Sequence, residues 1–481
     1  MLHGPHNGKT STISRRQAVN RLVAGGAAWC ATQRAETDRR PNIVFIFADD
    51  LGYGDLGVTG NLDLATPNID SIAAGGIRFT QFYVGSPICS PSRVAATTGQ
   101  FPSRHLIHSY LSDRKSQREL GMRNFLDPSA PCVARAFQAA GYATAHIGKW
   151  HMGGGRDVGD APLPQAYGFT ESLTSSEGLG DRVLEIDHVL SKQSAALGNG
   201  DMQWAPKHKL TEIYVDRAID FIRRNSSRPF YLHLWPTDVH DGHRPRGDLL
   251  EKYARFSSNP FVQRFYAVLD EFDRQIGRLL SAIDGLGLAG STLIVFTGDN
   301  GPTASPRYYE QGLQPPGSTG GFRGRKWSLY EGGIREPLLA RWKGRIPAGV
   351  VDQKTIMGAV DLFPSFCKLA AVKPRAAGFE GEDMSAAFLG KPCPRSKPLL
   401  WEYGRDERYM KPAAKEDQSP NLAIRDGHWK LLVNADGSQL ELYDLNAPPE
   451  ERDNLAGRYP KVARRLSSAV LDWRRSLPVL R

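Results

Sequence analysis

The sequence has 481 residues, which is enough for one large domain and a smaller one, with ample volume for a core. It carries 61 Lys and Arg residues against 51 Asp and Glu residues, so its formal net charge is +10 and its pI is near 9.3. The basic residues are scattered without a block of like charges, so the charge supports an anionic substrate only weakly, and we expect no nucleic-acid partner.

The first 38 residues resemble a bacterial export signal followed by a linker. Ser14-Arg15-Arg16-Gln17 precedes a short apolar stretch over residues 22–28, and the segment then stays polar as far as Arg40. This order is typical of a twin-arginine signal, which predicts a periplasmic or secreted protein. The apolar stretch is too short to cross a bilayer, so we expect no stable membrane span. The alternative is a disordered basic tail, and the cleavage site stays open.

Five apolar runs predict the strands of a large sheet. Asn42–Phe47 is rich in β-branched and aromatic residues, as in strands buried on both faces, and similar runs occupy 143–147, 230–235, 292–296 and 338–342. Apolar residues at three- and four-residue spacings predict intervening helices, the clearest over 269–283 and another that ends at Arg223-Arg224. Strands that alternate with helices predict an α/β fold with a mainly parallel, doubly wound sheet.

The pattern changes to short strands near residue 398. Residues 422–433 predict a β-hairpin around the turn Asp426-Gly427, and 440–443 can add a strand. The final helix places five apolar side chains on one stripe: Val462, Leu466, Val470, Trp473 and Leu477. We therefore expect a catalytic domain over 39–397 and a smaller C-terminal subdomain, an antiparallel sheet plus helix, over 398–481.

Polar residues stand directly after three of the predicted strands: Asp49 and Asp50, Lys149 and His151, and Asp299 and Asn300. The carboxyl ends of the strands in an α/β sheet share one edge, where ligands bind. Two adjacent carboxylates repel one another unless a cation lies between them, although a solvated turn is the alternative at both acidic segments. The oxygen donors at these ends suit a hard cation such as calcium far better than zinc.

Cys89-Ser90-Pro91-Ser92-Arg93 lies between an apolar run and small residues that can start a helix. Taken alone, it fits a buried thiol beside a proline turn as well as a nucleophile. The pattern resembles the signature of the type I sulfatases, in particular bacterial members similar to arylsulfatases and N-acetylgalactosamine-6-sulfatases. The resemblance runs from about Pro41 to the C-terminus and includes five further segments: Ala48–Asp55, Thr66–Asp70, Gly148–His151, Thr297–Gly301 and Gly324–Pro337.

This resemblance implies an alkaline-phosphatase-like architecture, with a doubly wound mixed sheet flanked by helices and a smaller C-terminal sheet. It also implies that a formylglycine-generating enzyme oxidises Cys89 to formylglycine (3-oxoalanine), which hydrates to a diol and acts as the nucleophile. One Ca²⁺ ion is expected at five positions: Asp49, Asp50, Cys89, Asp299 and Asn300. The ion would offset charge on the sulfate and lower the pKa of the diol.

The resemblance also implies roles for three cationic side chains and for histidines. Arg93, Lys149 and Lys326 would hold the sulfate oxygens and stabilise the charge that grows on them. His151 would orient or deprotonate the second hydroxyl of the diol. His240 matches the general acid that protonates the leaving alcohol, but the prolines around it are displaced from the family pattern, and His243 is its rival.

We therefore expect a sulfuric ester hydrolase that acts on a sulfated carbohydrate or an aryl sulfate ester. The alternatives are a phosphonate or phosphate ester hydrolase of the same superfamily and a catalytically silent sulfoglycan-binding protein. Trp150, Trp235 and Trp327 are candidates for stacking on a sugar ring, with core packing as the alternative. The sugar, the sulfated position, endo or exo action and the oligomeric state stay open.

The five cysteines are widely spaced and include no CxxC, so they indicate neither a zinc site nor a disulfide framework. A disulfide between two of Cys132, Cys367 and Cys393 stays possible.

Overall fold

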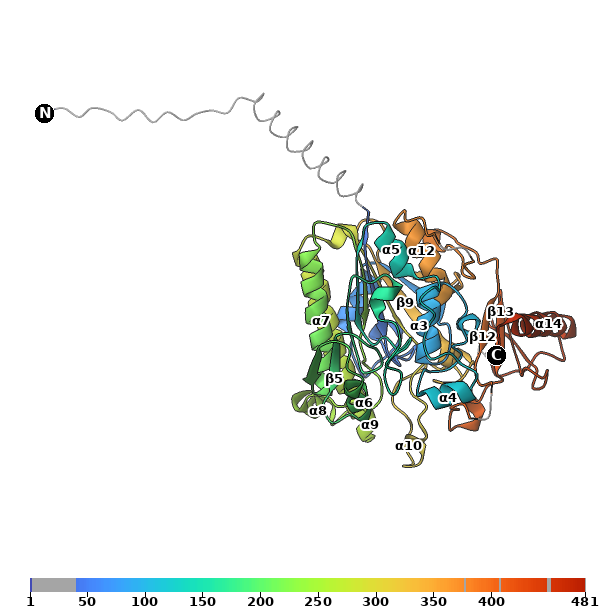
Figure 1. The fold of residues 1–481 in the computed structure, drawn as a ribbon. Helices are drawn as coiled ribbons and strands as arrows, with labels where there is room; N and C mark the ends of the chain where they lie inside the picture. The colour runs from blue at the N-terminus through green and yellow to red at the C-terminus, as the bar shows by residue number, and fades with distance from the viewer. Residues whose placement is uncertain (2–39, 376–377, 406–407, 448–450, 481) are drawn as a thin grey trace, which may run out of the picture. The chain divides into compact units, whose positions relative to one another are not determined.

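The computed structural model describes residues 1, 40–375, 378–405, 408–447 and 451–480 (Figure 1). From residue 2 onward, the predicted export signal lies outside the described residues. The chain from Pro41 to the C-terminus forms one compact unit, which is the subject of the description below. Within the described residues, no helix is both long enough and apolar enough to cross a membrane.

An 11-stranded sheet forms the centre of this unit. Its strands span Asn42–Ala48 (β1), Ile77–Tyr83 (β2), Ala143–Gly148 (β3), Glu171–Thr174 (β4), Arg182–Glu185 (β5), Met202–Ala205 (β6), Phe230–Trp235 (β7), Thr292–Gly298 (β8), Arg335–Arg341 (β9), Val350–Asp352 (β10) and Met357–Gly358 (β11). The order is β10-β2-β9-β8-β1-β7-β3-β4-β5-β6, and β11 pairs with β2. All five predicted strands form.

The sheet is mixed because β9 runs antiparallel to both of its neighbours, β2 and β8. The central strands β8, β1, β7 and β3 run parallel, as their apolar runs predict. Their carboxyl ends therefore share one edge of the sheet.

Helices cover both faces of the sheet. Six of them pack directly on the core residues of the sheet and span Pro67–Ala74 (α2), Cys89–Thr98 (α3), Val133–Ala139 (α5), Lys207–Arg224 (α7), Pro260–Gly285 (α9) and Leu362–Leu369 (α12). Further helices span Arg114–Glu119 (α4), Val189–Ala196 (α6), Gly247–Tyr253 (α8), Pro306–Tyr309 (α10), Glu331–Ile334 (α11) and Ser385–Phe388 (α13). Phe45 and Phe47 of β1 pack in the core with α3, α5 and α12, whereas Val44 and Ile46 pack with α2, α7 and α9. The predicted doubly wound α/β arrangement is confirmed.

Helix α9 contains the predicted apolar period but begins nine residues before it. Pro260 occupies the first turn, where its missing N–H is not needed, and the Asn259 side chain accepts a hydrogen bond from the Phe261 N–H at 2.9 Å. The cap, rather than the apolar period, therefore sets the start of the helix.

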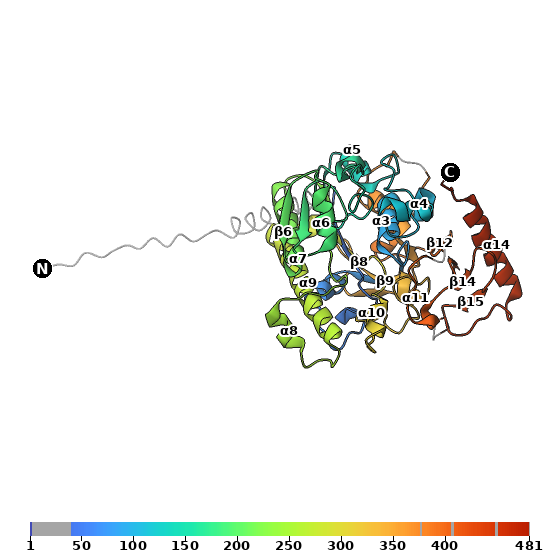
Figure 2. The same cartoon turned by 60° about the horizontal axis from the view of Figure 1, so that its bottom comes forward.

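A second sheet of four antiparallel strands lies in the C-terminal region (Figure 2). Its strands span Leu399–Glu402 (β12), Leu422–Asp426 (β13), Trp429–Val433 (β14) and Glu441–Asp444 (β15), and they pair in this order. Helix α14, Pro460–Ser476, packs Leu466 and Val470 against β13 and β14. The predicted hairpin and final helix are confirmed, whereas the domain division at residue 397 stays a prediction. Cys132, Cys367 and Cys393 are free thiols, so the possible disulfide does not form.

A buried ion cluster joins the small sheet to the main one. Lys430 Nζ of β14 lies 2.9 Å from Glu331 Oε1 and 2.7 Å from Glu451 Oε1, and these three side chains are almost completely buried. Glu331 begins α11, directly before β9, and also accepts a hydrogen bond from the Tyr83 hydroxyl at 2.6 Å. Lys430 thus compensates two carboxylates where the two sheets meet, and Arg335 Nη1 adds a second cation 3.2 Å from Glu331 Oε2.

We expect Lys430→Met to lower the free energy of unfolding by about 3–5 kcal/mol, because it leaves two buried carboxylates without their common cation. Chemical denaturation measures this loss. Lys461→Met, which removes an exposed lysine of α14, is the matched control and should change the value by about 0.5 kcal/mol or less. Equal stabilities of the two variants would contradict the structural role of the cluster.

Candidate active site

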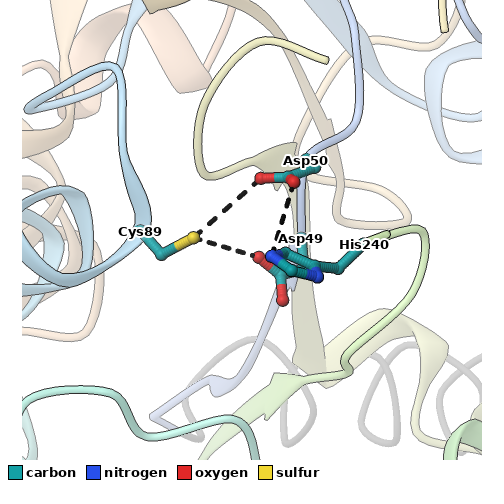
Figure 3. A group of neighbouring side chains, drawn as sticks. All are labelled: Asp49, Asp50, Cys89 and His240. Atoms are coloured by element: carbon teal, nitrogen blue, oxygen red, sulfur yellow. Dashed lines mark hydrogen bonds and ion pairs between the residues drawn. The ribbon is translucent and has the colours of Figure 1, made fainter. Parts of the chain in front are cut away.

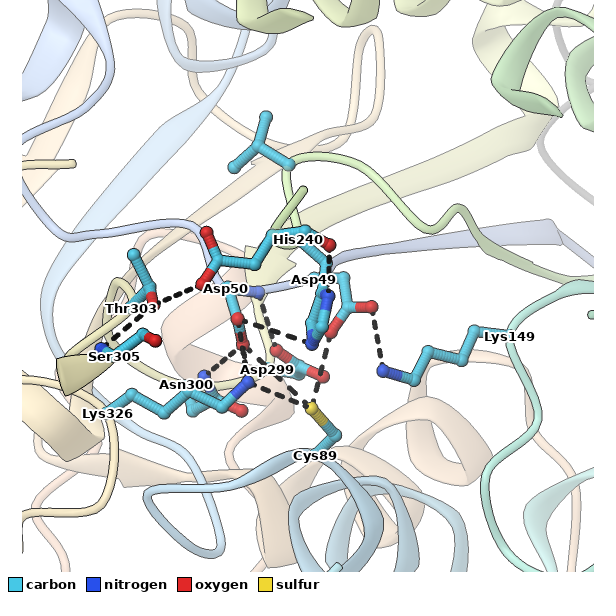
Figure 4. A network of polar contacts seen from close by, with 12 residues as sticks. Asp49, Asp50, Cys89, Lys149, His240, Asp299, Asn300, Thr303, Ser305 and Lys326 are labelled. Atoms are coloured by element: carbon cyan, nitrogen blue, oxygen red, sulfur yellow. Dashed lines mark hydrogen bonds and ion pairs between the residues drawn. The ribbon is translucent and has the colours of Figure 1, made fainter. Parts of the chain in front are cut away.

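The predicted site residues meet at the shared carboxyl edge of the parallel strands (Figure 4). The strands place six of them: Asp49 and Asp50 after β1, Asp299 and Asn300 after β8, Lys149 after β3 and His240 in the segment after β7. Two more come from other segments, because Cys89 is the first residue of α3 and Lys326 precedes α11. The sequence patterns therefore converge on one place in the fold.

Two glycines let the chain turn tightly at this edge. A Cβ atom on Gly148, whose φ is +118°, would lie 2.0 Å from the carbonyl oxygen of Trp235. The same oxygen accepts a hydrogen bond from the Lys149 N–H at 2.7 Å. A Cβ on Gly301 would lie 2.0 Å from the Gly332 carbonyl oxygen. Glycine at both positions is therefore required for the backbone contacts that hold Lys149 and the segment after β8 in place.

Cys89 lies at the centre of a small group of potential ligands (Figure 3). Its Sγ is 3.4 Å from Asp49 Oδ1 and 3.9 Å from Asp50 Oδ1. His240 Nε2 lies 3.6 Å from Asp50 Oδ2. One ligand atom from each of these four residues lies within 4.8 Å of the others. A sulfur, two carboxylates and an imidazole therefore face one small space.

Arg93 and Lys149 compensate the carboxylates on one side of this space. Arg93 Nη2 lies 2.6 Å from Asp299 Oδ2 and 3.5 Å from Asp49 Oδ1. Lys149 Nζ donates to Asp49 Oδ2 at 2.9 Å. Because the side chains of all four are at most 4% exposed, water does little to screen these ion pairs.

Lys326 compensates Asp50 on the other side. Its Nζ lies 2.6 and 2.7 Å from the two carboxylate oxygens of Asp50 and 3.8 Å from Cys89 Sγ. Its backbone N–H donates to the Pro302 carbonyl oxygen at 3.0 Å, which ties the segment before α11 to the segment after β8. Lys326 thus contacts both a predicted cation ligand and the predicted nucleophile.

These contacts control the ionisation of the site. Burial opposes ionisation of Asp49, but the surrounding cations, led by Lys149, hold the pKa of this carboxyl well below its usual value. Burial, then the charge of Asp299, raises the pKa of the Cys89 thiol well above its usual value. The unmodified sulfur is therefore protonated at neutral pH, and a protonated thiol is a poor nucleophile.

The acidic group has the donor set of a hard-cation site. Asn300 Nδ2 donates to Asp50 Oδ1 at 2.8 Å and to the Gly301 carbonyl oxygen at 2.9 Å. Among the described residues, the buried Oδ1 of Asn300 has no hydrogen-bond partner. The Asp50 N–H donates to Asp299 Oδ1 at 3.0 Å, which places the third carboxylate beside the first two. Three carboxylates and an unsatisfied amide oxygen suit a cation that prefers oxygen ligands.

The geometry distinguishes the two candidate general acids. His243 is almost fully buried, and its Nε2 lies 2.9 Å from the Val239 carbonyl oxygen while its ring packs edge-on against Phe265. His240 has a side chain that is 35% exposed and an Nε2 that faces Asp50. Its position beside both the acidic group and solvent favours His240 over His243.

Glu177 is a site residue that the sequence analysis missed. Its carboxylate lies 3.3 Å from Lys149 Nζ and 3.2 Å from His151 Nε2. Burial lowers the pKa of His151 to about 3, so its ring is neutral at pH 7. The Nε2 of this ring also lies 3.0 Å from the Leu111 carbonyl oxygen. Glu177 follows the four-residue strand β4, which is too short to be recognised in the sequence as an apolar run. The polar residues after this strand were the one sequence signal that could have indicated a site residue here.

Two of the three tryptophans cannot contact a ligand. Trp150 and Trp235 are 0% exposed and pack in the main core, where the Trp235 ring lies 5.2 Å from that of Phe47. Core packing, the alternative to stacking on a sugar, is therefore confirmed for both rings. Trp327 is 7% exposed and lines a hollow beside the C-terminal sheet.

The structure brings all the predicted site residues together. Nine are linked by direct contacts within the group: Asp49, Asp50, Cys89, Arg93, Lys149, His240, Asp299, Asn300 and Lys326. His151 joins them through Glu177, which also contacts Lys149. Their individual catalytic and metal-binding roles stay predictions.

Comparisons with known proteins agree with this arrangement. A family model described as Sulfatase matches residues 41–372, and one described as N-sulphoglucosamine sulphohydrolase, C-terminal, matches residues 319–476. Arylsulfatase A of Homo sapiens is 31% identical over 485 residues, which cover 90% of this chain and 87% of that protein. N-acetylgalactosamine-6-O-sulfatase of Bacteroides thetaiotaomicron is 27% identical, and the match covers 93% of this chain and 96% of that protein.

The crystal structure of Ps i-CgsB in complex with k-i-k-neocarrahexaose superposes with a TM-score of 0.74 at 25% identity. The match covers 92% of this chain and 94% of that one. The similarity therefore extends over both sheets.

Proposed function

The chain belongs to the sulfatase family and is a sulfuric ester hydrolase, and we propose that its substrate is a sulfated carbohydrate. We further propose that residue 89 acts as formylglycine beside one Ca²⁺ ion. The observation that carries this proposal is the position of Cys89 Sγ, 3.4 Å from an Asp49 oxygen and 3.8 Å from Lys326 Nζ. A nucleophile between a cation site and an ammonium group is well placed to attack an anionic ester.

Four side chains would hold the Ca²⁺ through oxygen: Asp49, Asp50, Asp299 and Asn300. The unsatisfied Asn300 Oδ1 supports this choice, because a cation would satisfy an acceptor that is otherwise buried without a partner. When bound, the ion supplies positive charge that offsets charge on the sulfate and lowers the pKa of a nearby hydroxyl. The sulfur of Cys89 faces the same group, so the modified residue would lie beside the ion.

The modification supplies what the thiol lacks. Because burial raises the pKa of Cys89, the unmodified side chain is a poor nucleophile, whereas hydrated formylglycine offers a hydroxyl. We propose that a formylglycine-generating enzyme makes this change during maturation. His151 is neutral and is held by Glu177 and Leu111, so it would orient or deprotonate the second hydroxyl of the hydrate.

Charge alone does not select a sulfate monoester over a phosphate monoester. Arg93, Lys149 and Lys326 pair with the carboxylates of the site, and Arg156 Nη2 adds a fourth cation 4.0 Å from Glu177 Oε1. The number of metal ions favours the sulfate ester, because phosphate monoester hydrolases of this superfamily usually need a second one. Among the described residues, one group is placed to hold a metal ion: Asp49, Asp50, Cys89 and His240. Arg93, Lys149 and Lys326 would hold the sulfate oxygens.

His240 would donate a proton to the leaving alcohol. Its partly exposed side chain lies at the edge of the acidic group, where an alcohol that leaves toward solvent would pass. The ring is held from its Nδ1, which lies 2.9 Å from the Asp241 carbonyl oxygen, so Nε2 faces the site. Sugar alcohols are poor leaving groups and need such a proton.

The carbohydrate substrate is supported by the relatives. One acts on N-acetylgalactosamine 6-O-sulfate by its name, and one structure holds a neocarrahexaose. An aryl sulfate is the simpler alternative, in line with the arylsulfatase relative. We also propose export from a bacterial cytoplasm through residues 1–38, a catalytic domain over 39–397 and a C-terminal subdomain over 398–481.

The function is tested with sulfate and phosphate esters of the same alcohol. We expect kcat/KM for the sulfate ester to exceed that for the phosphate ester by about tenfold or more, which corresponds to about 1.4 kcal/mol of transition-state stabilisation. Cys89→Ala should fold normally and show no turnover, and the peptide that contains residue 89 should have the mass of formylglycine. A preference for the phosphate ester would contradict the sulfatase assignment and favour a phosphatase or phosphonatase. Full activity with an unmodified thiol at residue 89 would exclude formylglycine as the nucleophile.

Calcium should stabilise the folded protein because only the folded chain assembles the ligands. At a free concentration 100 times the Kd, the gain is about 2.7 kcal/mol, which thermal melting detects as a rise in Tm. Asn300→Ala should reduce both this rise and the activity, whereas Asn446→Ala, at an exposed position in the C-terminal region, should change neither. An unchanged rate and Tm after exhaustive chelation would exclude the calcium site.

The role of His240 predicts a dependence on the leaving group. His240→Ala should lower kcat about 10²- to 10⁴-fold for a carbohydrate sulfate but much less for nitrophenyl sulfate, whose alcohol leaves without a proton. His243→Gln is the matched control, and it should lower Tm without this selective loss because His243 is buried against Phe265. If the His243 variant instead loses activity selectively toward the carbohydrate sulfate, His243 is the general acid.

A further inference from the structure

We propose that Lys207 is a positioning residue that holds the general acid His240 in place at the active site. Lys207 is the first residue of α7. Its Nζ donates to the carbonyl oxygen of His240 at 3.0 Å and to that of Asp241 at 2.9 Å. The inference rests on the general-acid role proposed for His240 and adds a residue that acts only through it.

The position of Lys207 is unfavourable for a cation. The residue is 8% exposed, so little water solvates its ammonium group. It also lies in the first turn of a helix, where the helix dipole disfavours positive charge, and no acidic residue of this turn offsets it. Within the described residues, its Nζ donates to the two carbonyl oxygens and to no carboxylate. An ion pair therefore does not explain a lysine here, whereas the contacts with the His240 segment do.

The Asp241 carbonyl oxygen is shared between Lys207 and the imidazole ring of His240. The Nδ1 atom of His240 lies 2.9 Å from this oxygen. Because a carbonyl oxygen can only accept a hydrogen bond, Nδ1 carries a hydrogen, and Nε2 is the nitrogen left to transfer a proton. The Nε2 atom lies 3.6 Å from Asp50 Oδ2, at the acidic group. By holding the shared oxygen, Lys207 fixes the direction in which Nε2 points.

Helix α7 holds the start of the same segment through a second side chain. Thr211 lies four residues after Lys207, so the two side chains project from neighbouring turns of one helix face. The Thr211 hydroxyl donates to Asp238 Oδ2 at 2.6 Å, and the Asp238 carbonyl oxygen accepts the Asp49 N–H at 3.0 Å. The segment that carries His240 is therefore tied both to α7 and to the end of β1.

The Asp241 side chain anchors the segment to a third part of the chain. Its Oδ2 accepts the Thr303 hydroxyl at 2.7 Å, and its Oδ1 accepts Arg307 Nη2 at 3.1 Å. Both partners lie in the segment after β8. Because these contacts involve only the carboxylate, the loss of Lys207 would leave the segment attached but would release the carbonyl oxygen that orients His240.

Binding of the substrate by the ammonium group is the alternative role. Lys207 lines a hollow of about 110 Å³ that also includes Asp49, Lys149, Glu177 and His240. Its Nζ already donates to two acceptors, which leaves at most one N–H for a ligand. The two roles predict different kinetics. Positioning of the acid changes kcat for esters with poor leaving groups, whereas substrate binding changes KM for every sulfate ester.

The test compares Lys207→Met with the wild-type mature enzyme on a carbohydrate sulfate and on nitrophenyl sulfate. Methionine keeps an apolar chain of similar length but has no donor for the carbonyl oxygens. We expect kcat for the carbohydrate sulfate to fall about tenfold, because a misaligned acid transfers its proton less readily, and kcat for nitrophenyl sulfate to stay within about twofold. Lys209→Met is the matched control, because it removes a partly exposed lysine of α7 that binds Glu212, and it should behave as the wild type.

A double-mutant cycle separates positioning from a general structural effect. In the His240→Ala background, Lys207→Met should cause no further loss toward the carbohydrate sulfate, because no acid remains to be positioned. Additive losses, or an equal fall in kcat for both esters, would overturn the inference. A rise in KM for both esters with kcat unchanged would also overturn it and assign Lys207 to substrate binding.

Lys207→Gln provides a second variant and takes the place of Lys207→Met if the methionine protein does not fold. Glutamine keeps an N–H donor on a shorter side chain, so its selective loss in kcat should lie between those of the wild type and the methionine variant. Glutamine kinetics that match the wild type, with an unfolded methionine variant, would show that Lys207 serves the fold alone and would overturn the inference.

The failure of this inference and that of the proposed general acid have different signatures. A selective loss in His240→Ala without one in the Lys207 variants would confirm the general acid and overturn the positioning role. If His240→Ala itself shows no selective loss, the general-acid role of His240 is wrong, and the inference about Lys207 is overturned with it.

Discussion

Charge compensation at the end of β1 is the constraint on which the rest of the site depends. Asp49 and Asp50 are adjacent and at most 3% exposed, so their carboxylates would repel one another strongly in the low dielectric of the interior. Lys149 and Lys326 each bind one of them, at 2.9 and 2.6 Å. Leaving either charge without its partner would cost several kcal/mol. The side chains that we propose to hold the sulfate are therefore also needed for the fold of the site.

The spacing of the Cys89 motif follows from helix geometry. Cys89 and Arg93 are four residues apart on α3, so they lie on the same face and both point at the carboxylates. Pro91 lies in the first turn, where a helix does not need its N–H. The Ser90 hydroxyl accepts the Leu111 N–H at 2.9 Å, and Leu111 in turn contacts His151. A five-residue pattern thus places the proposed nucleophile Cys89, the cation Arg93 and, through Ser90 and Leu111, a support for His151.

The sequence predicted those parts of the fold that depend on local patterns. Buried parallel strands such as β1 need continuous apolar runs, and the residues after them fall at one edge, so the meeting of Asp49 with Asp299 was predictable. The antiparallel direction of β9 and the role of Glu177 depend on contacts between distant segments, which no local pattern encodes. Stacking and core packing both stayed open for Trp150 and Trp235, because their neighbours in sequence face the site while their own side chains face the core.

The C-terminal sheet contributes to the site by holding the segment that carries Lys326. Arg323 donates to the Tyr443 hydroxyl at 3.1 Å, and the Gly324 N–H donates to Asp417 Oδ1 at 3.0 Å. The buried Lys430 binds Glu331, which lies five residues after Lys326. The segment around Lys326 is thus fixed at both ends by residues beyond position 398. The small sheet thus helps to hold Lys326 between Asp50 and Cys89 in the candidate active site, although none of the proposed catalytic side chains comes from it.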